Sequence, residues 1–181
     1  MEAGYIGSTE LKELVAREAP VNLAFPVSKL PRLAALVPAG QLAASVAGTG
    51  IDARLGFDAG TEGHPRLHLE VSGAVPVVCQ RCLEAMAWPV DVDVLLTMID
   101  RDAEAASLAD PFDTVVLVDG ALRTIELIED EVLAALPLAP RHPDMSCAGA
   151  VADEPISEGR PHRPMAGLAD LLRRDNRRGE E

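Results

Sequence analysis

The sequence predicts an α+β domain, in which an antiparallel sheet with one main packing helix is followed by a flexible C-terminal linker and a short docking helix. Apolar residues recur with a period of two along much of residues 41–118, which is typical of strands with one buried face. The period becomes helical over 125–136. After Cys147 the chain is rich in Gly, Pro, Glu and Ala without any period, which predicts a linker.

Residues 1–40 predict an N-terminal extension with two short helices and one strand. The first helix, 8–17, starts at a Ser–Thr pair of the type that caps helices, and its apolar residues share one face. The apolar segment 21–25 predicts a strand. A second helix opens near Ser28 and has Pro31 in its first turn, where a missing amide hydrogen costs little.

Residues 41–147 predict the α+β core domain. Six segments have the character of strands: 41–47, 51–57, 66–72, 75–79, 88–98 and 113–118. Glycines favour a hairpin turn at Gly48–Gly50, between the first two of these strands. In the fifth segment Asp91 and Asp93 alternate with valines, so we expect both aspartates on a solvated face of the sheet.

The segment 125–136 predicts the main packing helix of this core. Thr124 is expected to cap its start, and Pro137 ends it. Ile128 and Val132 lie on its expected buried face.

The charge of the 181-residue chain is strongly negative and uneven. It has 29 acidic residues against 16 Lys and Arg, a formal charge of −13, and only 3% aromatic residues. Such a surface repels phosphate, and so few aromatic rings argue against a platform for stacking bases. Between Glu84 and Glu131 there are 13 acidic residues but only two arginines, whereas arginines exceed acids from Arg160 onward. The charge distribution therefore favours an acidic adapter that binds a basic partner.

The sequence favours a cytoplasmic location. No apolar run approaches the roughly 18 residues that a membrane helix needs. The first residues lack the cationic head and apolar stretch of a secretory signal. Three cysteines do not suggest a disulfide framework.

Two cysteines separated by two residues form the most specific short pattern of the chain. Cys79 and Cys82 have the spacing that turns both sulfurs toward one metal ion or toward each other. His142 and Cys147, which follow the main helix, would complete a closed Cys3His zinc site with no position left for catalysis. The alternatives are a redox dithiol, and cysteines that are no more than small residues near a strand end.

Arg81 lies between the two thiols. A guanidinium there is suited to a bidentate contact with phosphate or carboxylate. The interpretation that we favour pairs it instead with Glu84 or with an acid of the sheet's solvated face.

The main helix carries the acids Glu126, Glu129 and Asp130. Paired carboxylates of an active site need a cleft that raises a pKa, and the sequence indicates none. We therefore expect a solvated acidic helix face that a basic partner covers.

Residues 148–163 predict the linker, and 164–181 predict an amphipathic basic tail. Met165, Leu168 and Leu172 form a short apolar stripe at helical spacing, followed by Arg173 and Arg174. The stripe is suited to docking in a groove of a partner or of its own domain. The arginines are expected to add a weak contact with RNA phosphates.

The sequence lacks two common signatures of enzymes. With only Lys12 and Lys29 available, it has no Gly-Lys-Ser/Thr phosphate loop, and it has no Gly-x-Ser-x-Gly elbow. We therefore expect a protein without catalytic residues.

Three stretches taken together resemble the YceD family of large ribosomal RNA subunit accumulation proteins. They are CQRCLE at 79–84, the helix and following segment 128–142 with Cys147 beyond it, and RPMAGLADLL at 163–172. The closing motif of the family commonly reads Asn-Pro-Phe-Ala-x-Leu, whereas Arg and Met replace its Asn and Phe here.

This resemblance implies a bacterial ribosome-biogenesis factor that supports the synthesis, processing or stability of large-subunit (23S) rRNA, without known catalysis. We expect it to act as an acidic adapter for a basic protein, such as a ribosomal protein or an rRNA-processing factor. The alternatives are a zinc-stabilised redox or stress sensor and, with less support, a metal-dependent RNA-processing enzyme.

Overall fold

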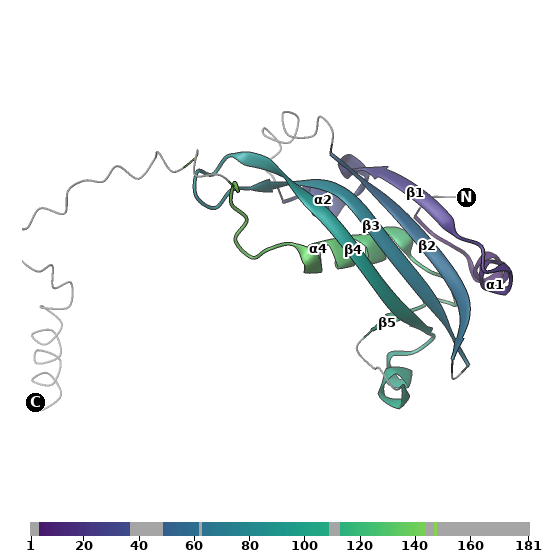
Figure 1. The fold of residues 1–181 in the computed structure, drawn as a ribbon. Coiled ribbons are helices and arrows are strands. Elements are labelled where there is room, and N and C mark those ends of the chain that lie inside the picture. The colour runs from purple at the N-terminus through teal and green to yellow at the C-terminus, as the bar shows by residue number, and fades with distance from the viewer. Residues whose placement is uncertain (1–3, 37–48, 62, 109–112, 144–146, 148–181) are drawn as a thin grey trace, which may run out of the picture. The chain divides into compact units, whose positions relative to one another are not determined.

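The computed structural model describes residues 4–36, 49–61, 63–108, 113–143 and 147, and these form one compact α+β unit (Figure 1). Its five-stranded sheet has the order β1-β2-β3-β4-β5. The strands are β1 Val21–Pro26, β2 Gly50–Thr61, β3 His64–Val78, β4 Ala85–Ile99 and β5 Thr114–Val116. The helices are α1 Ser8–Arg17, α2 Pro31–Ala34 and α4 Thr124–Ala135, with 3-10 turns at Val27–Lys29 and Asp102–Ser107.

The sheet is mixed, which corrects the expectation of a purely antiparallel one. β1, β2, β3 and β4 pair antiparallel in succession, but β5 runs parallel to β4, with Thr97 opposite Thr114. A parallel pair needs a crossover connection of about a dozen residues, and the chain between Ile99 and Thr114 is long enough for one. Alternation along a strand does not report its direction, so this pairing was not predictable from the pattern.

The segments predicted as two strands, 66–72 and 75–79, belong to one long strand, β3. Gly73 continues the strand at a φ of +145°, so the glycine does not end it. The predicted strand 41–47 and Gly48 lie outside the described residues. In the described part, the neighbour of β2 on this side is β1, with Phe25 opposite Ile51.

The N-terminal residues contribute to the same sheet and core. β1 is one of the two edge strands of the described sheet. Leu30 and Leu33, around the start of α2, are fully buried. Ile6 forms an isolated bridge with Leu122, just before α4. Residues 1–40 were expected as an extension. Within its described part, 4–36, buried apolar side chains such as Leu11 belong to the same core as those of the sheet.

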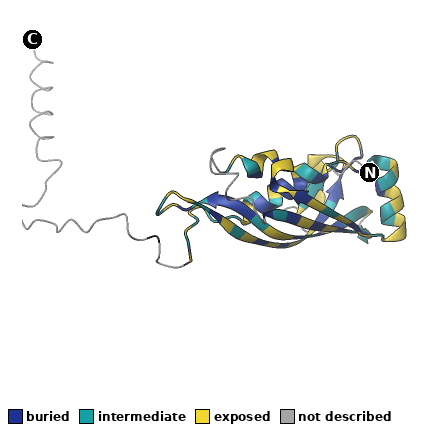
Figure 2. Cartoon of the chain, turned by 90° about the horizontal axis from the view of Figure 1, so that it is seen from above, coloured by how far each residue is buried: buried dark blue, intermediate teal, exposed yellow. Residues whose placement is uncertain are grey.

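The main helix forms as predicted, and it packs with α2 on one face of β3 and β4. Ile128 and Val132 are fully buried, as their spacing indicated. The helix starts at Thr124, so its N-cap position falls on Arg123, one residue before the predicted cap. Figure 2 shows buried and exposed residues alternating along the strands, so the opposite face of the sheet is solvated.

Within the described residues, no helix has the length and apolarity that a membrane crossing requires.

Candidate functional site

The turn between β3 and β4 holds both cysteines of the CxxC pattern. The Cys79 amide donates to the Glu84 carbonyl at 2.9 Å, and the Leu83 amide donates to the Cys79 carbonyl at 2.9 Å. The Gln80 amide donates to the Pro140 carbonyl at 2.8 Å. The last bond holds the segment that follows α4 against this turn.

Because of this contact, the four predicted metal ligands come together. Each of the four offers one ligand atom, and these atoms all lie within 4.8 Å of one another. We call this group the thiol–imidazole cluster: Cys79, Cys82, His142 and Cys147. The Cys79 and Cys147 sulfurs are 3.8 Å apart, and the Cys82 sulfur lies 3.5 Å from His142 Nδ1. Cys79 is fully buried, and the other three are half-buried.

Arg81 faces the cluster, a contact that the sequence did not predict. Its Nε donates to the Cys147 sulfur at 2.9 Å, and its Nη2 donates to the His142 carbonyl at 3.4 Å. Its amide also donates to the Cys79 sulfur at 3.5 Å. The sequence could not indicate this role, because Cys147 lies 66 residues away along the chain.

These surroundings separate the two thiols of the CxxC pattern chemically. Burial raises the pKa of Cys79, but backbone amides of Cys82 and Arg81 stabilise its thiolate, and the balance lowers the pKa to about 5. For Cys82 a backbone hydrogen bond from Glu84 lowers the pKa, but burial and the neighbouring Cys79 outweigh it, and the pKa is raised. At neutral pH the cluster therefore presents a thiolate beside a guanidinium.

Leu83 occupies the left-handed backbone region, with a φ of +62°, directly after the second cysteine. This conformation costs a residue with a side chain about 1–2 kcal/mol, and the leucine recovers little by burial because it is 66% exposed. After allowance for the greater freedom of glycine in the unfolded chain, we expect Leu83→Gly to raise the free energy of unfolding by about 0.5–1 kcal/mol. Urea denaturation measures this.

The matched control is Leu138→Gly, because Leu138 is fully exposed and does not have a positive φ. It should lose about 0.5 kcal/mol or less through backbone entropy alone. If Leu83→Gly were less stable than this control, the turn would not be strained.

Of the three carboxylates predicted on a solvated face of α4, Glu126 and Asp130 are exposed, but Glu129 is buried. Glu129 is only 2% exposed, and its Oε1 accepts hydrogen bonds from the amides of Arg32 at 2.7 Å and Leu33 at 3.3 Å. Asp130 forms an ion pair with the Arg32 guanidinium, and Glu126 pairs with Arg123 at 2.8 Å. Each of these three carboxylates has a partner within the fold, Glu129 in the core and the other two at the surface.

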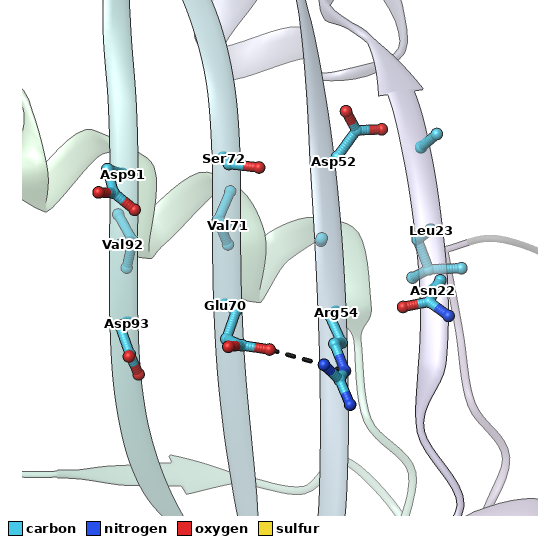
Figure 3. A pocket seen from close by; sticks show the side chains of 12 residues that line it. Asn22, Leu23, Asp52, Arg54, Glu70, Val71, Ser72, Asp91, Val92 and Asp93 are labelled. Atoms are coloured by element: carbon cyan, nitrogen blue, oxygen red, sulfur yellow. Dashed lines mark ion pairs between the residues drawn. The ribbon is translucent and has the colours of Figure 1, made fainter.

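Uncompensated acidic charge gathers on the solvated face of the sheet instead. Figure 3 shows side chains from β1 to β4 that line a hollow on this face, two neighbouring rows of them polar. The hollow has a volume of about 480 Å³. The register of the strands places Asp52, Ser72 and Asp91 in one row. Arg54, Glu70 and Asp93 form the other. We call the four carboxylates Asp52, Glu70, Asp91 and Asp93 the acidic sheet face.

Local pairing compensates only part of this charge. Arg54 lies 3.6 Å from Glu70, as the dashed line in Figure 3 marks, and His68 Nε2 lies 2.6 Å from Asp93. Within the described part of the chain, Asp52 and Asp91 have no cationic partner. The alternation of Asp91 and Asp93 with valines predicted that both aspartates are exposed. Asp52 and Glu70 became candidates only through the strand register.

Comparison with known proteins assigns this chain to a family. The family model described as "Large ribosomal RNA subunit accumulation protein YceD" matches residues 67–172, which is more than half of the chain. The chain belongs to the YceD family. No solved structure matches it.

The YceD match covers the thiol–imidazole cluster, α4 and three of the four carboxylates of the acidic sheet face, Glu70, Asp91 and Asp93. Asp52 on β2 lies before it. The predicted tail residues Met165, Leu168, Leu172, Arg173 and Arg174 all lie outside the described residues.

Proposed function

We propose that this YceD-family protein supports the synthesis, processing or stability of large-subunit (23S) rRNA as a non-enzymatic acidic adapter. Family membership supports the connection to large-subunit rRNA. The acidic sheet face carries the adapter part of the proposal. Its occupant would be a Lys- or Arg-rich segment of a ribosomal protein or of an rRNA-processing factor in the cytoplasm.

A basic segment fits this surface on electrostatic and steric grounds. Four carboxylates surround the hollow, and among the described residues Arg54 is the only one with a basic side chain that lines it. Complementary charge of this kind speeds association and excludes acidic partners such as free nucleic acid. The binding would weaken as salt is added, because the Debye length is only about 8 Å at physiological ionic strength.

The thiol–imidazole cluster supports a second candidate function, a redox or stress sensor. A Cys79 thiol with a pKa of about 5 and a second sulfur at 3.8 Å is the arrangement of a reactive dithiol. Full burial of Cys79 opposes this reading, because an oxidant must reach the sulfur. We therefore rank it below the adapter.

Removing charge from the acidic sheet face tests the adapter. The double variant Asp52→Asn/Asp91→Asn keeps the shape of both side chains, and neither has an ion pair to lose in the described structure. In bacterial cells that lack the native protein, we expect it to restore less 23S rRNA relative to 16S rRNA than the wild type does. Quantification of both rRNAs measures this.

The control is Glu13→Gln/Asp102→Asn, which removes the same charge from exposed positions far from the hollow in sequence. It should restore 23S rRNA as fully as the wild type does. Equal restoration by both double variants would exclude the acidic sheet face. If the wild type itself restored no 23S rRNA, the role in rRNA accumulation would be excluded.

A further inference from the structure

We propose that the thiol–imidazole cluster binds one zinc ion in a closed, tetrahedral, structural site. Four ligand atoms of the types that zinc prefers, three sulfurs and one imidazole nitrogen, converge from two segments about 60 residues apart. The proposal concerns a cofactor and does not depend on the adapter function.

Two of the six distances between ligand atoms match the edges of a zinc tetrahedron, and all six are within 4.8 Å. Zinc binds sulfur at about 2.3 Å and imidazole nitrogen at about 2.0–2.1 Å. Tetrahedral angles then place two sulfurs about 3.8 Å apart, and a sulfur and a nitrogen about 3.6 Å apart. The structure has 3.8 Å between the Cys79 and Cys147 sulfurs, and 3.5 Å between the Cys82 sulfur and His142 Nδ1.

The surroundings also balance the charge of such a site. Three thiolates around Zn²⁺ leave an excess of one negative charge, and Arg81 supplies a positive one, with its Nε 2.9 Å from the Cys147 sulfur. The Arg81 amide directs a further N–H group to the Cys79 sulfur. Hydrogen bonds to ligating atoms are the usual means by which a protein orients and stabilises a metal site.

A disulfide explains the geometry less well than a metal does. It would join two sulfurs at about 2.05 Å, and it would leave the third cysteine and His142 without a role. A metal ion uses all four groups and ties the segment after α4 to the β3–β4 turn. Since four protein ligands leave no open position, the site is structural and not catalytic.

The test is the metal content of the purified full-length protein. We expect one zinc per chain by mass spectrometry of the elements, and we expect Cys82→Ser and His142→Ala each to lose stoichiometric zinc. Arg81→Met should keep the site but weaken zinc affinity about 10–100-fold, as removal of hydrogen-bond partners of metal ligands does. The control His68→Asn, in the exposed His68, Glu70 and Asp93 group, should retain one zinc.

Cobalt substitution and thiol titration keep the proposal testable if a ligand variant fails to fold. Co²⁺ in the wild-type protein should show tetrahedral d–d bands and thiolate-to-cobalt charge transfer. Cysteine thiols should react slowly until a chelator is added. The proposal is overturned if the folded wild type binds no zinc after reconstitution, if Co²⁺ shows no thiolate bands, or if His68→Asn loses the metal while the cluster variants keep it.

Discussion

Replacement of Gly73 by alanine is expected to lower the free energy of unfolding by about 3–5 kcal/mol. A Cβ at this position would lie 2.1 Å from the Gly50 carbonyl oxygen, which is a backbone atom and has no rotamer to change. The φ of +145° adds strain of about 1–3 kcal/mol for any residue with a side chain. β2 and β3 would therefore have to separate locally. Urea denaturation followed by Trp88 fluorescence, the only tryptophan, measures the loss.

The control for this prediction is Gly56→Ala, in the same pair of strands. Its Cβ would meet His68 Cβ at 3.6 Å, an ordinary van der Waals contact, and Gly56 does not have a positive φ. We expect a change of less than about 1 kcal/mol in either direction. If the free energy of unfolding fell by similar amounts in the two variants, β2 and β3 could move apart at Gly73 at little cost, which would contradict the prediction.

Replacement of Glu129 by alanine is expected to cost about 2–4 kcal/mol. The Glu129 carboxylate accepts two backbone amides at the start of α2, and its loss leaves both without that acceptor in a largely buried place. Each unsatisfied buried group costs about 1–3 kcal/mol. At about 2–4 °C per kcal/mol, the melting temperature should fall by about 5–15 °C.

Two variants separate the acceptor role of Glu129 from its charge and position. Glu129→Gln keeps an acceptor oxygen, and we expect it to lose about 1 kcal/mol, since a charged acceptor binds amides more strongly. Glu126→Ala, on the exposed side of the same helix, breaks a solvated pair with Arg123 and should lose about 0.5 kcal/mol or less. Equal melting temperatures for Glu129→Ala and Glu126→Ala would contradict the structural role.

The role of Glu129 also decides where a basic partner is expected to bind. Glu129 accepts amides of α2 within the core, and Asp130 pairs with Arg32 of α2 at the surface, so both charges are used to hold α2 against α4. Asp52 and Asp91, on the opposite face of the sheet, are not used in this way. The proposed adapter surface is therefore the sheet and not the helix.

The sequence by itself determined most of the local elements and the membership of the thiol–imidazole cluster. Alternation of valines with Asp91 and Asp93 predicted β4 and its solvated face, and helical spacing predicted α4 to within one residue at each end. The CxxC spacing, with His142 and Cys147 downstream, selected the four residues that the fold brings together. These signals are local, because periodicity reports which face of an element is buried.

Tertiary structure alone decided what depends on contacts between distant segments. Three features depend on such contacts: β5 runs parallel to β4, Glu129 is buried against α2, and Arg81 lies against Cys147. Strand register decided that Asp52 and Glu70 share a surface with Asp91 and Asp93. Periodicity cannot report such neighbours, because the energy that selects them comes from packing between elements and not from the conformational preferences within one.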